Sequence, residues 1–195
     1  MTAQDLKNSI LQLAIQGKLV EQRPEEGTAK ELLEQIKVEK EQLMKEGKIK
    51  KDKPLPVIID DEIPFEIPEN WEWVRLSSIC TKLVDGDHNP PKGEFVKTPY
   101  IMASSTNINR DAIVDLEKVR YLSEKVFLKV NERTNVTEGD ILFTSVGTLG
   151  RSCIYNGEYN ICFQRSVSVM TTLILNIYLK YCFDSSYFQY KIIRS

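Results

Sequence analysis

The sequence contains few of the residues that form reactive or metal-binding centres. It has one histidine, His88, and four cysteines among 195 residues, and no two cysteines have Cys-x-x-Cys spacing. A zinc site of the usual spacing is therefore not expected. No glycine-rich segment is completed by the residues of a nucleotide-binding motif, so we expect no cofactor. These absences favour a binding protein over an enzyme.

Long apolar runs and an excess of positive charge are also missing. No apolar run approaches 18 residues, and residues 1–17 do not have the pattern of a signal peptide, so we expect a cytoplasmic location and no membrane contact. The formal net charge is −2 at pH 7. A free-standing nucleic-acid-binding protein usually carries a basic footprint. Binding to DNA would therefore need a local basic face or partners that supply charge.

Two amphipathic helices are predicted near the start of the chain. Thr2 and Asp5 have the spacing of a helix start, and Thr28 and Glu31 form a capping box that begins the second helix. Each helix is followed by a glycine that should end it. The helices either pack on their own domain or form an arm that pairs with another helix in this chain or in a partner. The sequence leaves both alternatives open.

The remainder of the chain predicts an α+β domain with a mixed, twisted β-sheet, hairpins and flanking helices. Residues 1–53 are expected to form a helical arm and linker, and residues 54–195 the globular domain, incomplete at its C-terminal end. A helix is expected over 123–130 with Ser123 as its cap, and another from about Asn176 through Ile192. Short apolar runs predict the strands, which are Thr98–Ala103, Asp111–Val114, Val119–Leu122, Asp140–Thr144, Arg151–Tyr155 and Val167–Thr172.

The stretch 139–170 combines strands with polar turns. Asn156-Gly157 is the residue pair that a two-residue hairpin turn favours, so we expect it to join two paired strands. The Thr144–Arg151 turn carries two glycines, hydroxyl groups and an arginine. Its Gly-x-x-Gly pattern by itself favours a tight turn, and together with the hydroxyl groups and Arg151 it suits contact with phosphates or bases. Gln164-Arg165 suits contact with base edges but equally suits the bracing of a sheet edge.

The loop from Asp85 to Lys92 offers two further comparisons. Asn89-Pro90-Pro91 partly matches the Asn-Pro-Pro-aromatic motif of DNA amino-methyltransferases, but its fourth residue is Lys92, so a rigid proline loop is the favoured interpretation. His88 lies between acidic residues, which could suggest a metal ligand or a general base. A lone histidine in such a loop is more often a surface residue, and it could instead contact a phosphate or a base edge.

Five segments of the chain resemble one protein family. GDILFTSVGTLGR with NICFQRSVSVM, at 139–151 and 160–170, is similar to the target-recognition domain of specificity subunits in type I restriction–modification systems. The segment 67–76, IPENWEWVRL, is similar to the entry to such a domain. The segments 11–20 and 29–41 resemble the helical region that precedes it. The resemblance covers most of the chain.

The resemblance implies a role in recognition without a reaction. Such a subunit would bind a sequence in double-stranded DNA and direct modification (methyltransferase) and restriction subunits to a two-part site. Family members usually carry two recognition domains, whereas this chain has one, so self-association through the helices is a possible way to form a pair. The alternative is a truncated subunit that binds other proteins through its helices without binding DNA.

Base-contacting residues of this family lie on variable loops, so the candidates come from side-chain chemistry. Their hydroxyl, amide and cationic groups suit phosphates or base edges. The candidate DNA contacts are Lys82, His88, Asn89, Lys92, Ser104, Ser105, Asn107, Thr144, Ser145, Thr148, Arg151, Gln164 and Arg165.

Overall fold

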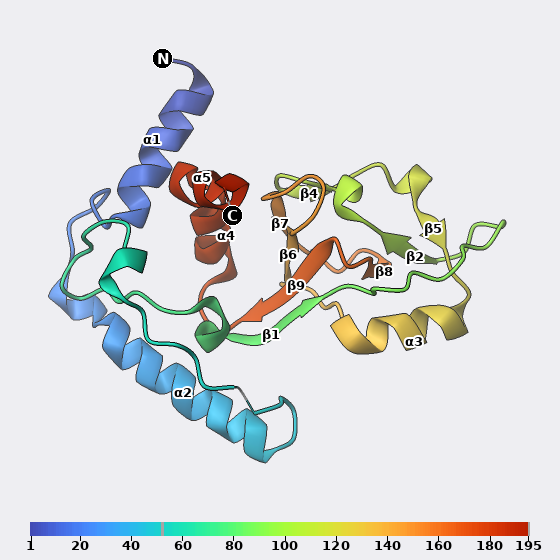
Figure 1. Ribbon diagram of the computed structural model, residues 1–195, viewed down its shortest axis with the longest axis horizontal. Helices are drawn as coiled ribbons and strands as arrows, with labels where there is room; N and C mark the ends of the chain where they lie inside the picture. Colours follow the sequence, from blue (N-terminus) through green and yellow to red (C-terminus); the bar gives the residue numbers. More distant parts are fainter. Residues whose placement is uncertain (52, 195) are drawn as a thin grey trace. The chain divides into compact units, whose positions relative to one another are not determined.

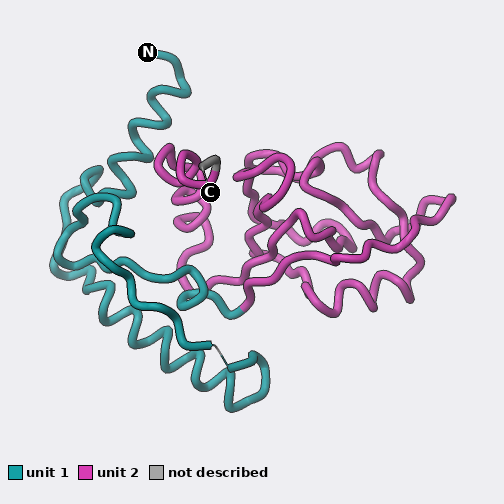
Figure 2. Tube along the Cα trace, in the orientation of Figure 1, with its two compact units in different colours: residues 1–81 teal, residues 82–195 magenta. Residues whose placement is uncertain are grey.

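The chain folds into two compact units. The computed structural model describes residues 1–51 and 53–194, and its units are residues 1–81 and 82–195 (Figure 2). Helices and several sheets make up the chain, which confirms the predicted α+β class (Figure 1). Compactness does not identify what a segment does, so the assignment of recognition to residues 54–195 stays a prediction.

The first unit contains both predicted amphipathic helices. Helix α1 spans Ala3–Ile15 and helix α2 spans Ala29–Lys45. Both begin with a capping box, in which the Thr2 and Thr28 hydroxyls accept hydrogen bonds from the backbone N–H groups of Asp5 and Glu31, at 3.1 and 3.2 Å. Short 3₁₀ turns lie at Pro24–Glu26, Asp60–Glu62 and Leu76–Ile79.

Residues 68–79 pack along α2 within this unit. The Ala29 N–H donates to the Asn70 carbonyl at 2.8 Å, and the Lys40 ammonium group donates to the Ser77 carbonyl at 2.8 Å. The Trp71 indole N–H donates to the Gln22 side chain at 2.9 Å. The second helix therefore packs on residues of its own chain, which is the first of the two alternatives, for this helix.

The second unit contains three sheets. The four-stranded sheet has the order β1-β9-β6-β7, the three-stranded sheet has the order β5-β2-β8, and β3 pairs with β4. The β2–β8 pair is parallel and the β2–β5 pair antiparallel, so the three-stranded sheet is mixed. The strands are β1 (Cys80–Asp85), β2 (Tyr100–Ala103), β3 (Ile108–Asn109), β4 (Ala112–Ile113), β5 (Arg120–Tyr121), β6 (Ile141–Thr144), β7 (Ser152–Ile154), β8 (Asn160–Phe163) and β9 (Val167–Thr172).

The hairpin predicted at Asn156-Gly157 is wrong. Strand β7 pairs with β6, whereas β8 pairs with β2 in a different sheet, so the segment between β7 and β8 passes from one sheet to the other. Only Gly157 has a positive φ, whereas the expected hairpin turn needs one at both residues. The Tyr155 hydroxyl accepts from the Tyr159 N–H at 2.9 Å and closes a wider loop. The antiparallel hairpin of this region is instead β6–β7.

Three helices complete the second unit, namely α3 (Glu124–Thr134), α4 (Asn176–Asp184) and α5 (Ser186–Arg194). Ser123 occupies the cap position of α3 but makes no side-chain capping bond. The single C-terminal helix expected from the sequence is broken at Ser185. The Ser185 hydroxyl donates to the Cys182 carbonyl at 2.7 Å and accepts from the Phe188 N–H at 3.3 Å. This hydroxyl thus forms hydrogen bonds with a backbone carbonyl in the last turn of α4 and with a backbone N–H in the first turn of α5.

The hydrophobic core lies on both faces of β2 and β8. Ile101, Ala103, Ile161 and Phe163 belong to one buried cluster, which also contains residues of β6 and β9. Met102 and Cys162 belong to a second cluster, where they pack against α3 residues including Phe127. Alternate residues of a strand point to opposite faces of a sheet. This burial on both faces leaves mainly the loops at the strand ends available for contact with a partner.

Candidate nucleic-acid interface

Three polar loops meet where β2, β6 and β8 end. They are residues 104–107, 145–151 and 164–166. The Ser105 N–H donates to the Ser166 hydroxyl at 3.1 Å, and the Ser145 N–H donates to the Ser166 carbonyl at 3.0 Å. The Thr148 hydroxyl donates to the Ser105 carbonyl at 2.7 Å. These bonds join residues that are about 20, 40 and 60 positions apart in the chain, so only the folded chain brings the candidates together.

The loop that follows β1 joins the same cluster. The Asp87 N–H donates to the Phe163 carbonyl at 2.8 Å, and the Arg165 N–H donates to the Asp87 carbonyl at 2.9 Å. Asp87 and Gln164 form an isolated parallel bridge. Gly86 is needed here because a Cβ at this position would lie 2.3 Å from the Phe163 and Gln164 carbonyl oxygens. We call residues 85–92, 104–107, 144–151 and 164–166 the loop cluster.

The Thr144–Arg151 turn is held by its own hydrogen bonds. The buried Thr144 hydroxyl accepts from the Arg151 N–H at 2.9 Å and donates to the Thr148 carbonyl. The Gly150 N–H donates to the Thr144 carbonyl at 2.9 Å, and Gly147 and Gly150 both have positive φ. The glycines thus permit a tight turn, which agrees with the interpretation that the Gly-x-x-Gly pattern alone favoured.

The candidates of the loop cluster differ in exposure. His88, Asn89, Lys92 and Arg165 are exposed, whereas Ser105, Asn107 and Thr144 are buried. The half-buried candidates in the cluster are Ser104, Ser145, Thr148, Arg151 and Gln164. Exposed cations and amides can reach a ligand without any rearrangement. For all of these residues, contact with DNA stays a prediction.

Two of the less exposed candidates donate to carbonyls of the protein itself. The Asn107 side-chain amide donates to the Val114 and Asp115 carbonyls at 3.2 and 3.1 Å, and its oxygen accepts from the Ser104 N–H at 3.0 Å. One Arg151 guanidinium nitrogen donates to the Ile108 carbonyl at 3.4 Å. Both side chains hold the connection through β3 and β4 in place. Arg151 keeps further donors, since a guanidinium group carries five N–H bonds.

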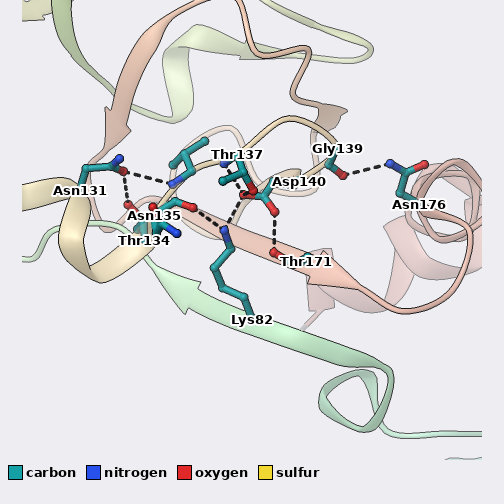
Figure 3. A network of polar contacts seen from close by, with 10 residues as sticks. Lys82, Asn131, Thr134, Asn135, Thr137, Gly139, Asp140, Thr171 and Asn176 are labelled. Atoms are coloured by element: carbon teal, nitrogen blue, oxygen red, sulfur yellow. Dashed lines mark hydrogen bonds and ion pairs between the residues drawn. The ribbon is translucent and has the colours of Figure 1, made fainter. Parts of the chain in front are cut away.

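Lys82 lies away from the loop cluster, near the start of β6. Its ammonium group donates to the Asp140 carboxylate at 2.6 Å and to the Asn135 carbonyl at 2.7 Å (Figure 3). Asp140 is fully buried and also accepts from the Thr137 N–H at 2.8 Å and the Thr171 hydroxyl at 2.6 Å (Figure 3). Asp140 directly precedes β6, whereas Thr144 ends it. Lys82 therefore compensates a buried charge at the opposite end of this strand.

Two exposed residues in or beside the loop cluster were not named individually among the sequence-based candidates. Thr106 lies in the 104–107 loop, and Arg110 lies at the turn between β3 and β4. The adjacent Asp111 has a positive φ of 75°, as expected for a tight turn. The sequence Asn109-Arg110-Asp111 carries turn-forming residues, which could have indicated an exposed arginine here.

Two cysteine thiols of the second unit, those of Cys153 and Cys162, are buried. Burial raises the pKa of the Cys153 and Cys162 thiols to about 12, so neither is a thiolate nucleophile near neutral pH. Among residues 1–51 and 53–194, no group of three or more histidine, cysteine or acidic side chains is arranged to hold a metal ion. Over the same residues, no helix is both long and apolar enough to cross a membrane.

Comparison with known proteins identifies relatives of this chain. No protein-family model matches it. The Type I restriction enzyme EcoEI specificity subunit of Escherichia coli is 56% identical over 155 residues, which cover 76% of this chain and 25% of that protein. The EcoAI specificity subunit of the same organism is 65% identical over 74 residues, or 38% of this chain and 13% of that protein.

A third relative agrees with these two. The Type I restriction enzyme EcoBI specificity subunit of Escherichia coli is 30% identical over 129 residues, covering 61% of this chain and 26% of that protein. The matched regions make up about a quarter or less of the length of each relative. This chain therefore belongs to the family of type I restriction enzyme specificity subunits.

Proposed function

We propose that this chain recognises a sequence in double-stranded DNA as the specificity subunit of a type I restriction–modification complex. It would direct modification and restriction subunits to a two-part site, and it would itself catalyse no reaction. The observation that carries the proposal is the loop cluster, which joins four polar segments on a chain of this family. The cytoplasmic location expected from the sequence is part of the same proposal.

The candidates divide into two roles under this proposal. The exposed side chains of His88, Asn89, Lys92 and Arg165 are the first to meet DNA, with the half-buried candidates behind them. The buried candidates support the loops from within, since Thr144 and Asn107 bond to neighbouring backbone groups. Cations that meet phosphates would set the position on the duplex, and contacts to base edges would set the sequence.

Helix α1 supports an additional role in assembly. Leu6, Ile10 and Leu13 follow helical spacing and are 51%, 42% and 43% exposed. Such a stripe is suited to packing against another helix. Under this proposal α1 contributes to association with modification subunits or with a second copy of the chain. If the helices alone were functional, the chain would bind these partners without binding DNA.

A reconstituted complex tests the proposal. The purified chain is combined with modification subunits from its own system, and a random-sequence duplex library is enriched for bound DNA. We expect enrichment of one two-part sequence, and footprinting should show that the complex protects it. Assembly with the modification subunits without any sequence enrichment would instead support the protein-interaction alternative. Methyl transfer by the isolated chain would contradict the assignment as a non-catalytic subunit.

Arg165→Ala is the most direct residue-level prediction of this proposal. Arg165 is exposed in the loop cluster, and its backbone, not its side chain, bonds to Asp87. If the guanidinium group contacts a base, its loss should weaken binding of the enriched duplex by about 1–3 kcal/mol and relax specificity at one position. The measurement is a titration of labelled duplex with the assembled complex.

Lys129→Ala is the matched control for Arg165. Lys129 is an exposed cation on α3, a helix that packs on β2 and β8. Its replacement should leave both affinity and sequence preference unchanged. Equal affinities for wild-type, Arg165→Ala and Lys129→Ala complexes would remove Arg165 from the interface.

A further inference from the structure

One loop of the second unit exposes two neighbouring apolar side chains, one of them completely. We call residues 92–97 the Phe95 loop. Phe95 is 107% exposed and Val96 is 74% exposed, and both lie between the exposed lysines Lys92 and Lys97. The loop belongs to the segment between β1 and β2, which extends beyond the strands at one end of the unit (Figure 1).

The stem of this loop is fixed even though its tip is exposed. The Glu94 N–H donates to the Tyr121 carbonyl at 2.7 Å, and the Arg120 guanidinium group donates to the Pro91 carbonyl at 2.9 Å. On the other side, the Thr98 hydroxyl donates to the Leu122 carbonyl at 2.7 Å. Both ends of the loop are therefore tied to β5 and the residue that follows it. The loop holds Phe95 and Val96 away from the core.

The exposure of these two side chains carries a cost in free energy that a bound partner would remove. Burial of a phenylalanine or valine side chain is favourable relative to exposure in water. The Phe95 loop has no contact that provides this burial within the described chain, since Phe95 is as exposed as an isolated residue. Apolar side chains that project together from a fixed stem are suited to insertion into a partner.

The charges around the tip favour DNA as the partner. Lys92 and Lys97 lie on either side of the apolar pair, and Arg120 lies at the stem. These three cations outnumber the single carboxylate of the loop, that of Glu94. This arrangement suits DNA, because the cations can bind phosphates while the apolar side chains between them contact bases. Proteins that bend DNA insert phenylalanine and similar wedges between base steps in this way. A protein partner would more commonly meet a larger apolar area without two flanking cations.

The Phe95 loop is also continuous with the loop cluster. The segment from Asp87 to Glu94 begins at the bridge with Gln164, in the cluster, and ends at the bridge between Glu94 and Tyr121. His88, Asn89 and Lys92 are exposed along this segment. A duplex bound along it would reach both the loop cluster and Phe95.

We propose that Phe95 is a DNA wedge that stacks on or between bases, while Lys92 and Lys97 bind phosphates on either side of it. This inference rests on the proposed function and adds a contact residue that the sequence-based candidates did not include. Phe95 would act through base stacking, which tolerates different bases. It would therefore contribute to affinity and DNA bending more than to the choice of sequence.

Substitutions of Phe95 test the wedge in the assembled complex. The probe is the duplex enriched by the wild-type complex from a random-sequence library. Phe95→Ala should weaken its binding roughly 5- to 150-fold, as expected for the loss of one aromatic–base stack. Phe95→Trp should keep the affinity, and its added fluorescence, measured as the difference from the wild-type complex, should be quenched by DNA. Leu128→Ala is the control because Leu128 is 61% exposed on α3.

Salt dependence separates the wedge from its neighbouring cations. Lys92→Ala and Lys97→Ala should each reduce the slope of log affinity against log salt by about 0.9, because each removes one phosphate contact. Phe95→Ala should leave that slope unchanged, since stacking releases no counterions. A tip that contacts only phosphates would give no affinity loss for Phe95→Ala.

The outcomes distinguish this inference from the proposed function. If wild-type complex binds the duplex but Phe95→Ala binds equally well and Phe95→Trp shows no quenching, the wedge is wrong and the DNA-binding function stands. If Phe95→Ala weakens assembly with modification subunits in the absence of DNA, the loop is a protein contact and the wedge is also wrong. If the wild-type complex binds no DNA, both the proposed function and the wedge fail.

Discussion

At the scale of single residues, burial of neighbouring groups decides whether a polar side chain bonds to the protein itself or is available to a ligand. Lys82 has the chemistry of a phosphate contact, but its ammonium group lies 2.6 Å from the fully buried Asp140 carboxylate. A buried carboxylate without a cation is costly, because desolvation penalises its charge. The primary task of Lys82 in the free chain is therefore to compensate Asp140.

Lys82→Ala should lower the free energy of unfolding by about 3–5 kcal/mol, the usual cost of removing one partner from a buried ion pair. Urea denaturation followed by far-UV circular dichroism measures this change. Lys129→Ala, which removes an exposed lysine of the same unit, should have almost no effect. Adding Asp140→Asn to Lys82→Ala should recover part of the loss, because it removes the uncompensated charge. Equal stability of the two lysine variants would contradict this account.

The buried cysteines lead to a second residue-scale prediction. Burial raises the pKa of Cys153 and Cys162 to about 12, well above the usual range of a thiol. Because the thiolate is the reactive form, neither should be alkylated by iodoacetamide at pH 8 in the folded chain. Both should react after denaturation in urea. Mass spectrometry of peptides from native and denatured samples checks this, and rapid native labelling of either residue would show that its site opens.

At the scale of elements, most strands and helices were predictable but their pairing was not. The capping boxes and the strand at 167–172 follow from local patterns, and the structure confirms them. The Asn156-Gly157 hairpin failed because β8 pairs with β2, a strand 60 positions earlier in register. Local turn chemistry reports the conformations that two residues accept. It does not report which strand supplies the neighbouring hydrogen bonds.

A substitution at Gly86 tests the close approach between β8 and the segment that follows β1. A Cβ on Gly86 would lie 2.3 Å from the Phe163 carbonyl oxygen, so either β8 or the segment after β1 would have to move. Gly86→Ala should therefore lower the free energy of unfolding by about 1–3 kcal/mol, the cost typical of overpacking. Urea denaturation provides the measurement.

Gly93→Ala is the matched control in the same segment. A Cβ on Gly93 would lie 3.4 Å from the Arg120 Cβ, which is an ordinary contact. Its effect on stability should stay within about 0.5 kcal/mol. If Gly86→Ala were as stable as Gly93→Ala, the close approach at Gly86 would not be a constraint on the fold.

At the scale of the whole molecule, charge governs association more than it governs the fold. The net charge is −2 at pH 7, and the isoelectric point calculated from the sequence is about 5.6. The chain also exposes apolar side chains on α1 and at Phe95. Molecules with little net charge repel one another weakly, so exposed apolar groups can then associate.

Self-association of the purified chain should therefore be strongest near pH 5.6 and weaker at pH 8. Dynamic light scattering at equal concentration and ionic strength compares the two conditions. The expected result is a larger mean particle size near the isoelectric point. A size that does not change with pH would show that net charge is not what keeps the chains apart.

The fold class, the capped helices, most strand positions and the family follow from the amino-acid pattern alone. Each of these depends on residues near one another in the chain, or on a pattern shared with relatives. The polar candidates also follow from the sequence, because the residue types fix which hydrogen-bonding groups each side chain carries. The sequence could not separate exposed Arg165 from buried Thr144, since burial depends on packing between distant segments.

Which candidates lie together and which remain accessible depends on the folded chain. Ser105, Thr148 and Ser166 meet through hydrogen bonds between loops that the sequence places far apart. Lys82 lies apart from this group, where its ammonium group pairs with the buried Asp140 carboxylate. Phe95 gains its importance in the same way, since an ordinary apolar residue in the sequence becomes a fully exposed one in the fold. The physical reason is that exposure and pairing are properties of long-range packing, which no local pattern contains.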